Sequence, residues 1–388
     1  MPARIRTLVL DANGFGWRSV LRDTVTHGLR LRHLLRIAGP RAERLRSFLL
    51  RPRYEALSYV LDWREALCAA PRLQVDVCNI NDVVDLAKHL RRIKSYDLVI
   101  VLHSATGDSV SMLLRAAPLL NRRSGPLVVF QGNEYVGLGE KIRFLNETHA
   151  EYVCTQLPLD AGRWLYGGTS ARVLEMPHAL NPLLYRPIER AGREIDIGFV
   201  GALYDRTIGD TERTTLIRLF MEQQDALCLQ CDIRIGTIAR SDWALFLARC
   251  KGIIGAESGT YYLQRDGRAI ACAVQTVRRE PDVPFAEVFD RCFRTARDYV
   301  SGKAISSRHF EPIGTKTCQL LLEGRYNGVL HADEHFISIK RDLSNIDDCL
   351  RKFRDEAYRK EMVERTYDFV MDAHTYRHRV DSLIAAVA

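Results

Sequence analysis

Short apolar runs alternate with longer helix-like segments along most of this chain, and that alternation constrains the fold more than any other feature. RTLVLDA (6–12) and YDLVIVLH (96–103) are nearly continuous in Val, Leu and Ile. Strands of this composition are buried on both faces, as in a parallel sheet covered by helices. Further runs of this kind are LQVDVCNI (73–80), GPLVVFQGN (125–133), EYVCTQ (151–156) and ARVLEMP (171–177), with helices expected at 41–69, 82–93, 108–121 and 139–148.

Three prolines, Pro177, Pro182 and Pro187, interrupt this pattern. Because a proline disfavours helical backbone at the residue before it, we expect an extended connector here. The alternation then restarts with strands at 195–203, 231–238 and 250–257 and helices at 211–228 and 241–249. Later expectations are a helix at 284–300, strands at 327–332 and 335–339, and helices at 344–354 and 356–387.

A chain of 388 residues is too long for one comfortable hydrophobic core. We therefore predict an α/β fold of two Rossmann-like domains that face each other across a cleft. The first domain is expected over 1–177, the linker over 178–190, the second domain over 191–370 and a closing C-terminal helix over 371–388. In open α/β sheets of this type, ligands bind outside the carboxyl ends of the strands.

The stretch SSRHFEPIGTKTCQLLLEG (306–324) contains a glutamate and a proline before an apolar run. Pro312 suits the first position of a helix, which makes Glu311 the expected N-cap or its neighbour, with the helix ending at Gly324. One interpretation is that Glu311 only caps this helix. The other is that Glu311 binds ribose hydroxyls while Gly314, Thr315 and Lys316 in the first turn bind phosphate.

The net charge of +8 is concentrated in one segment. Residues 27–53 contain eight arginines and one glutamate, a net +7, which leaves +1 for the rest of the chain. Proteins that bind nucleic acid usually spread their cations along a groove between aromatic residues, so we expect no nucleic-acid partner. Leucines alternate with the arginines in this segment. It is either a helix that packs on the first sheet or an amphipathic helix that lies on an anionic membrane surface.

No secretory leader or membrane-spanning run is visible in the sequence, so we expect a cytoplasmic protein. The ten cysteines are scattered, and residues such as Cys154, Cys272 and Cys318 lie in apolar contexts. We expect them to be reduced and buried. Cys228 and Cys231 form a single CxxC without a second pair or a histidine at zinc spacing, which favours packing over metal binding.

Residues at the ends of the expected strands are the candidates for a site in the first domain. His103 suits proton transfer or hydroxyl binding, although a histidine bonded to nearby backbone would look the same. Gly14 allows a ligand to approach the backbone, or simply forms a tight turn. Asn133 and Glu134 are either acceptor-binding residues or turn residues.

The second domain offers a more specific set. Gly201 ends a strand, and Arg206 and Arg213 follow at the entry to a helix, where backbone amides and guanidinium groups can bind phosphate. The alternative is that both arginines are solvated beside nearby acidic residues. Glu257 and Ser258 follow the next strand, where the carboxylate could bind sugar hydroxyls or cap a helix.

These pieces, in this order, resemble the GT-B glycosyltransferases of group 1 type, in their spore-coat-like branch. MPHALNPLLYRP (176–187) resembles the connector of that family, and IDIGFVGALYDR (195–206) its first donor-domain strand and glycine turn. The stretch from 306 to 324 with HFISIKRDLSNIDDCLRKFRD (335–355) and AHTYRHRVDSLI (373–384) resembles its nucleotide-sugar segment and closing helices. The likeness covers about 175–388 well and the first 170 residues only as architecture.

The resemblance implies transfer of a sugar from a nucleotide-diphosphate-sugar to a glycan, lipid-linked or glycoprotein acceptor, without a bound metal or other cofactor. Glu311 would hold the donor ribose, and Arg206 and Arg213, assisted by Arg308 or Lys316, would neutralise the diphosphate. Many relatives carry two glutamates separated by seven residues, but in this chain Lys303 lies eight positions before Glu311 and Gln319 eight positions after it. Glu257 would take its place, which leaves retention or inversion open. A non-catalytic or epimerase-type protein of the same fold is the alternative.

Overall fold

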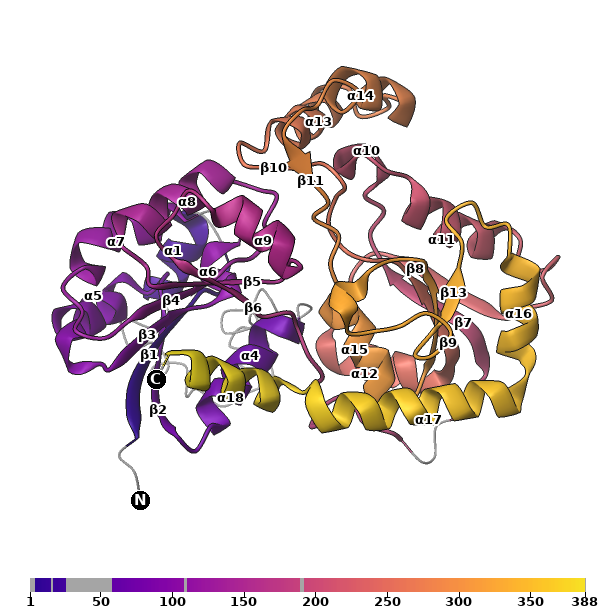
Figure 1. Ribbon diagram of the computed structural model, residues 1–388, viewed down its shortest axis with the longest axis horizontal. Coiled ribbons are helices and arrows are strands. Elements are labelled where there is room, and N and C mark those ends of the chain that lie inside the picture. Colours follow the sequence, from indigo (N-terminus) through magenta and orange to yellow (C-terminus); the bar gives the residue numbers. More distant parts are fainter. Residues whose placement is uncertain (1–3, 15–16, 26–57, 108–109, 189–191, 388) are drawn as a thin grey trace, which may run out of the picture. The chain divides into compact units, whose positions relative to one another are not determined.

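The computed structural model describes residues 4–14, 17–25, 58–107, 110–188 and 192–387 (Figure 1). It divides into two compact units, which are treated separately below. The first unit comprises Met1–Thr155, Gly162–Glu175 and Val380–Ala388, and the second comprises Gln156–Ala161 and Met176–Arg379. The described residues do not include the arginine-rich segment 27–53, which was predicted either to pack on the first sheet or to lie on a membrane. They also leave out most of the helix expected at 41–69.

The first unit is built on a six-stranded parallel sheet in the order β2-β1-β3-β4-β5-β6. Its strands are β1 (Ile5–Asp11), β2 (Leu73–Asn79), β3 (Leu98–Val101), β4 (Leu127–Phe130), β5 (Tyr152–Thr155) and β6 (Arg172–Glu175). Its helices are α1 (Trp17–Asp23), α4 (Ser58–Ala69), α5 (Val83–Arg91), η2 (Ile93–Ser95), α6 (His103–Thr106), α7 (Ser111–Leu120), α8 (Leu138–Glu147) and α9 (Leu159–Tyr166). Every residue of β3 and β4 is buried, as the apolar runs predicted.

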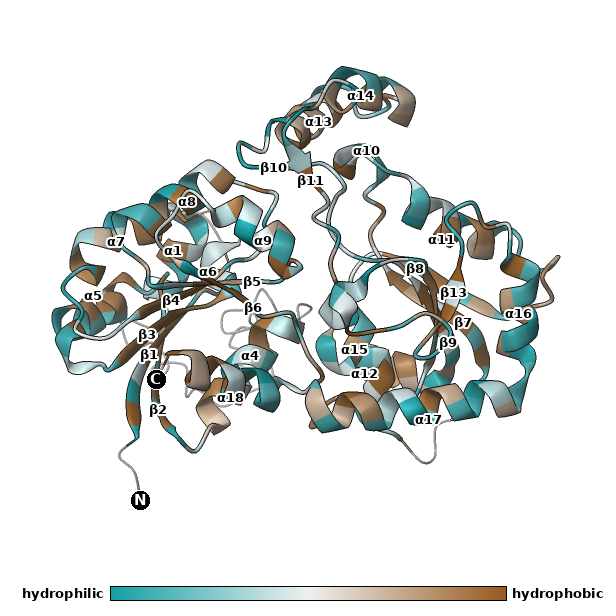
Figure 2. Ribbon diagram, in the orientation of Figure 1, coloured by the Kyte–Doolittle hydropathy of each residue, from teal (hydrophilic) through white to brown (hydrophobic). Residues whose placement is uncertain are grey.

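The second unit has a five-stranded parallel sheet in the order β13-β12-β9-β7-β8. The strands are β7 (Ile195–Gly201), β8 (Cys231–Ile235), β9 (Cys250–Gly255), β12 (Cys318–Leu322) and β13 (Ile337–Ile339). Its helices include α10 (Asp205–Ile208), α11 (Glu212–Glu222), α12 (Arg240–Arg249), α15 (Ser307–Gly314), η3 (Tyr326–Gly328), α16 (Ile346–Arg354) and α17 (Glu356–Ala373). The strands of both sheets are mostly hydrophobic, whereas α16 is largely hydrophilic and α17 is mixed (Figure 2). The predicted fold class, two parallel α/β sheets, is confirmed.

An insertion, residues 259–303, leaves the second sheet after β9 and returns before α15. It consists of β10 (Leu263–Gln264), α13 (Arg268–Arg279), α14 (Phe285–Cys292) and β11 (Tyr299–Val300). The two strands pair antiparallel, and α13 lies beside α14 (Figure 1). The expectation that all cysteines are reduced is wrong here, because a disulfide joins Cys272 of α13 to Cys292 of α14.

Other expectations in this half of the chain are also wrong, and the single helix expected at 356–387 is two helices that end and begin on either side of residues 374–375. The helix expected at 284–300 ends at Cys292, and residues 327–332 form no strand. The apolar run QLLL lies in strand β12 rather than in a helix, because it pairs with β9 on one side and β13 on the other. A short fully buried run fits a helix or a strand equally well, and only its neighbours decide.

The segment expected as a linker begins with well-packed residues of the second unit. Leu180 and Tyr185 are fully buried in its core, and Leu180 forms a parallel bridge with Thr375. The chain ends in α18 (Tyr376–Val387), most of which belongs to the first unit. Among the described residues, no helix combines the length and apolar character that crossing a bilayer requires.

Candidate functional site

The candidate site lies at the carboxyl edge of the second sheet, where β7, β9 and β12 end. In a parallel α/β sheet each connecting helix runs back toward the amino ends of the strands, so helix N-termini gather at the carboxyl edge. The first turn of α15 therefore lies at this edge, beside the residues that follow β9. Helix N-termini of this kind favour anions.

His309 fixes the first turn of α15 against the end of β9. The backbone N–H of the N-cap residue Ser306 donates to His309 Nδ1 at 2.9 Å, which leaves the ring proton on Nε2. Nε2 then donates to the carbonyl of Ala256 at 3.1 Å. Burial lowers the pKa of His309 to about 4, so the ring stays neutral at physiological pH. This role of His309 was not predicted, although Ser-x-x-His has the spacing of a capping box.

Glu311 is not the N-cap residue, and that expectation is wrong. Ser306 has the extended backbone of an N-cap, with φ −125° and ψ 172°, and Pro312 lies inside the helix rather than at its first position. Glu311 is 3% exposed, and its Oε2 accepts a hydrogen bond from Trp243 Nε1 at 2.6 Å. Glu311 therefore does not cap this helix. Its burial beside the Trp243 N–H is not explained by a capping role.

Arg308 completes a small cluster with Glu311 and Trp243. Its guanidinium carbon lies 4.2 Å from the centroid of the Trp243 ring, and its Nε lies 3.9 Å from Glu311 Oε2. Trp243 lies near the start of α12, which also begins at the carboxyl edge. A cation over an aromatic face and a carboxylate held by that ring's N–H give the cluster a fixed geometry.

Glu257 lies at the end of β9 and holds the turn that follows β12. Its Oε1 accepts the backbone N–H of Tyr326 at 2.7 Å, and burial raises the pKa of the carboxyl group. A Cβ on Gly324 would stand 2.4 Å from Glu257 Oε2, so a side chain there would require Glu257 to move. The side chain thus caps the short helix η3, as one of the two interpretations expected. Ser258 beside it is exposed, and its backbone pairs with Ala304.

The two arginines expected to bind phosphate have different surroundings. Arg213, in the first turn of α11, lies over the rings of Phe199 and Tyr204 at 5.5 and 5.4 Å, close to Gly201 at the end of β7. Arg206 instead donates to the carbonyls of Pro281 and Val283 in the insertion. Arg213 is therefore held at the carboxyl edge, whereas Arg206 ties α10 to the insertion.

The interpretation that Gly314, Thr315 and Lys316 form the first turn of a helix is wrong. Gly314 is the last residue of α15 and Thr315 its C-cap, so this end presents carbonyls rather than amides. Arg193, just before β7, binds the carbonyls of Thr315 and Lys316. These three residues lie at the amino edge of the sheet, opposite Glu257, and Lys316 pairs with Glu364 of α17.

A buried ion pair between the end of the insertion and the turn from α10 to α11 was not predicted. Lys303 Nζ lies 2.8 Å from Asp210 Oδ2, with both side chains less than a tenth exposed. The ammonium group also lies 4.5 Å from the centroid of the Tyr261 ring, and the Tyr261 hydroxyl donates to Glu212 at 2.8 Å. Along the chain Lys303 is marked only by its place eight residues before Glu311, and nothing there indicates its partner.

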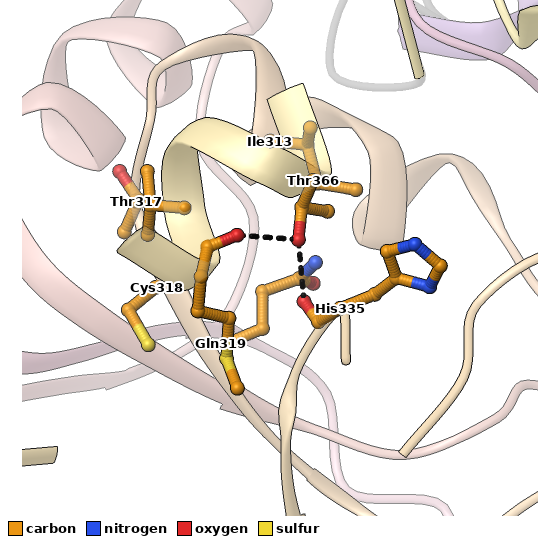
Figure 3. Close-up of a pocket in the computed structure, with 8 residues that line it drawn as sticks. Ile313, Thr317, Cys318, Gln319, His335 and Thr366 are labelled. Atoms are coloured by element: carbon orange, nitrogen blue, oxygen red, sulfur yellow. Dashed lines mark hydrogen bonds between the residues drawn. The ribbon is translucent and has the colours of Figure 1, made fainter. Parts of the chain in front are cut away.

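A small cavity lies between α15, the start of β12 and α17 (Figure 3). In Figure 3, Thr366 donates to carbonyls of Met362 and His335 at 2.7 and 3.2 Å. Gln319 donates through Nε2 to the carbonyl of His309 at 3.0 Å. With a volume of about 10 Å³ the cavity has room for about one water molecule, so it is not the nucleotide site.

In the first unit, the candidates at the strand ends are held by internal contacts. His103 is buried among the rings of Trp63 and Phe130, with centroids 5.9 and 5.1 Å away. Glu134 is 6% exposed, and its Oε1 accepts hydrogen bonds from Thr155 and Tyr166 at 2.6 and 2.7 Å. Neither arrangement tests a role in acceptor binding or proton transfer, which remain predictions.

Gly14 and Asn133 both occupy unusual backbone conformations. Gly14 has φ 130°, and its carbonyl accepts from Asn81 Nδ2 at 2.8 Å. Asn133 has φ 44°, and its carbonyl accepts from Lys141 Nζ at 2.9 Å. A carboxylate that was not among the expected site residues, Asp11, ends β1; it pairs with Arg64 at 3.0 Å, and burial raises its pKa.

The comparisons with known proteins agree with the resemblance over part of the chain. Residues 273–385, which include Arg308 and Glu311, match the family described as glycosyl transferase-like. No curated protein matches the sequence. Among solved structures, Anabaena Alr3699/HepE, determined with UDP-glucose, is 12% identical over 99% of this chain and 100% of that chain, with a TM-score of 0.49. The T4 phage BGT structure with its UDP-glucose substrate is 10% identical over 99% of both chains, with a TM-score of 0.47.

Proposed function

We propose that this chain, whose residues 273–385 match the glycosyl transferase-like family, moves a sugar from a nucleotide-diphosphate-sugar donor to a glycan acceptor. The observation that carries the proposal is the Glu311–Trp243–Arg308 cluster, two of whose members lie in the family segment. A buried carboxylate at the edge where parallel sheets bind ligands is suited to accept hydrogen bonds from ribose hydroxyls.

The diphosphate of the donor would bind next to this cluster, at the N-terminus of α15. Backbone amides of the first turn and the guanidinium groups of Arg308 and Arg213 favour an anion there. His309 supports this turn from behind, because its two ring nitrogens are used by Ser306 and Ala256. The ring is neutral, so it fixes the position of the turn without adding charge.

Sugar transfer requires the departure of a nucleoside diphosphate, and negative charge grows on the phosphate oxygens as the glycosidic bond breaks. Prearranged amides and guanidinium groups stabilise that charge without reorganising during the reaction. We propose that these groups do so without a metal ion or other cofactor. Glu257 accepts the Tyr326 N–H, so its proposed role is to orient the turn that carries Arg325 and Tyr326.

The acceptor would bind in the first unit, for which Gly14, His103, Asn133 and Glu134 remain the candidates. We propose a cell-surface polysaccharide, lipid-linked glycan or glycoprotein as the acceptor, and peripheral membrane attachment through 27–53. Sedimentation with anionic liposomes tests the attachment, using a variant with Arg30, Arg32, Arg36, Arg44 and Arg46 changed to glutamine. Equal, negligible sedimentation of both proteins would exclude it.

The donor proposal is tested by a panel of nucleotides. UDP, GDP and ADP, with their common sugar conjugates, are screened by thermal shift, because a ligand that binds only the native state raises the melting temperature. The best donor, radiolabelled in the sugar, is then followed for release and transfer. Binding without release, or conversion of the sugar while it stays on the nucleotide, would instead support the non-catalytic or epimerase-type alternative.

A further inference from the structure

Cys78, Asp85 and His89 form a cluster in the first unit that the proposed transfer reaction does not use. Cys78 is the penultimate residue of β2, and Asp85 and His89 lie one helical turn apart on α5. The Cys78 thiol, a carboxylate oxygen of Asp85 and an imidazole nitrogen of His89 all lie within 4.8 Å of one another. Of the described residues, no other group of three His, Cys, Asp or Glu meets this condition.

The surroundings of His89 determine which of its nitrogens is available. The Tyr96 hydroxyl lies 2.7 Å from Asp76 Oδ2 and 2.8 Å from His89 Nδ1, and when it donates to Asp76 its oxygen accepts from Nδ1–H. With that donor pattern the proton of the neutral ring is on Nδ1. Arg92 lies 3.2 Å from the same nitrogen and donates to Asp76 at 3.3 Å.

This tautomer leaves the lone pair of His89 Nε2 on the side of the cluster, 3.5 Å from Asp85 Oδ2. Histidines that bind metals characteristically donate their other ring N–H to an outer partner, which orients the ring. Here Tyr96, itself fixed by Asp76, is that partner. In this tautomer His89 can bind a cation through Nε2 without turning its ring.

We propose that Cys78, Asp85 and His89 bind a zinc ion. Thiolate and imidazole ligands favour zinc over magnesium or calcium, and three protein ligands with one water complete a tetrahedral site. Ligand atoms around zinc lie about 3.3–3.7 Å apart, so small side-chain movements suffice. The Cys78 proton leaves to solvent on binding, and a water molecule could reach the ion past Asp85, whose side chain is 37% exposed.

Bound zinc would join the end of β2 to the first two turns of α5. The site belongs to the first unit alone, whereas the proposed donor residues belong to the second. Donor binding is therefore a separate property, which loss of zinc should leave intact.

The test is zinc titration of the full chain after chelator treatment, by competition with a chromophoric chelator. One equivalent of zinc is expected, and cobalt in its place should give a thiolate-to-cobalt charge-transfer band. Cys78→Ser and His89→Gln should abolish both. Cys154→Ser, a buried cysteine in β5 of the same sheet, is the matched control and should retain both. A Cys228→Ser/Cys231→Ser variant excludes binding at the CxxC.

Two further variants keep the test decisive if core changes impair folding. Asp85→Asn alters a half-exposed side chain and should weaken binding, while Tyr96→Phe leaves all three ligands in place and should weaken it about 10- to 100-fold through loss of the outer partner. The proposal is overturned if wild type binds no zinc, or if Asp85→Asn and Tyr96→Phe bind it as tightly as wild type.

Discussion

Replacing Glu311 with glutamine separates a donor-binding role from a packing role. The structure indicates a small effect on folding, because glutamine keeps an oxygen for the Trp243 N–H. What is lost is the charge on a hydrogen bond and the attraction of Arg308 at 3.9 Å. Since Arg308 is 41% exposed, solvent screens that attraction strongly, and the total loss of stability should be about 1 kcal/mol.

The effect on the donor should be larger. A carboxylate that accepts hydrogen bonds from ribose hydroxyls contributes about 1.5–3 kcal/mol through charge-assisted bonds. Glu311→Gln should therefore weaken donor binding, or reduce kcat/KM, by about 10- to 150-fold. Calorimetric titration with the nucleoside diphosphate and its sugar conjugate measures this, alongside urea unfolding of the same protein.

Trp243→Phe is the matched control for this experiment. It keeps an aromatic face for Arg308 but removes the N–H, which leaves Glu311 Oε2 without that donor and should cost about 1–3 kcal/mol of stability. Donor binding should change less than in Glu311→Gln. If both variants lose stability and neither loses affinity for the donor, Glu311 is only the acceptor of Trp243, and the proposed ribose contact is wrong.

Three other results are expected. Arg213→Ala should weaken UDP or GDP binding about tenfold by calorimetry, and Arg206→Ala much less, because Arg206 is bonded to insertion carbonyls; equal losses would contradict this assignment. Lys303→Met should cost about 3–5 kcal/mol in urea unfolding by leaving the buried Asp210 unpaired, and Asp210→Asn in the same chain should recover part of it. Burial lowers the pKa of His309 from 6.5 to about 4, so its contribution to stability is present above pH 6.5 and falls away, by about 3 kcal/mol, between pH 6.5 and 4. The difference between wild type and His309→Gln, unfolded in urea at pH 7 and pH 4, isolates this slope, and a constant difference would show that His309 is not buried in its neutral form.

The parallel sheets could be predicted from the sequence because their signal is local. A strand such as Leu98–Val101, buried on both faces, must be apolar at every position, and the helix that follows must supply the next crossover. Strand ends can be recognised along the chain in the same way, and the carboxyl ends of parallel strands are where ligands bind. Gly201, Arg213 and Glu257 were therefore predicted at this edge and do lie there.

The roles of residues around 306–324 needed the tertiary structure. The sequence pattern suggested a helix that starts at Pro312, but Ser306 begins it, because His309 receives the Ser306 N–H and reaches Ala256 more than fifty residues earlier. That shift moves Thr315 and Lys316 from the amide end of a helix to its carbonyl end, and so to the opposite edge of the sheet. The Ser-x-x-His spacing is compatible with this start, but only the contact with Ala256 in the folded chain selects it over a start at Pro312.

The physical reason is the range of the interactions. The spacing of apolar residues depends only on neighbours a few positions apart in the sequence. This local pattern determined the strands and the helices between them. The partners of a particular side chain come from distant segments: Trp243 for Glu311, Asp210 for Lys303, and Cys292 for Cys272. Which of many possible partners meets each group depends on the order β13-β12-β9-β7-β8, and only the folded chain decides that order.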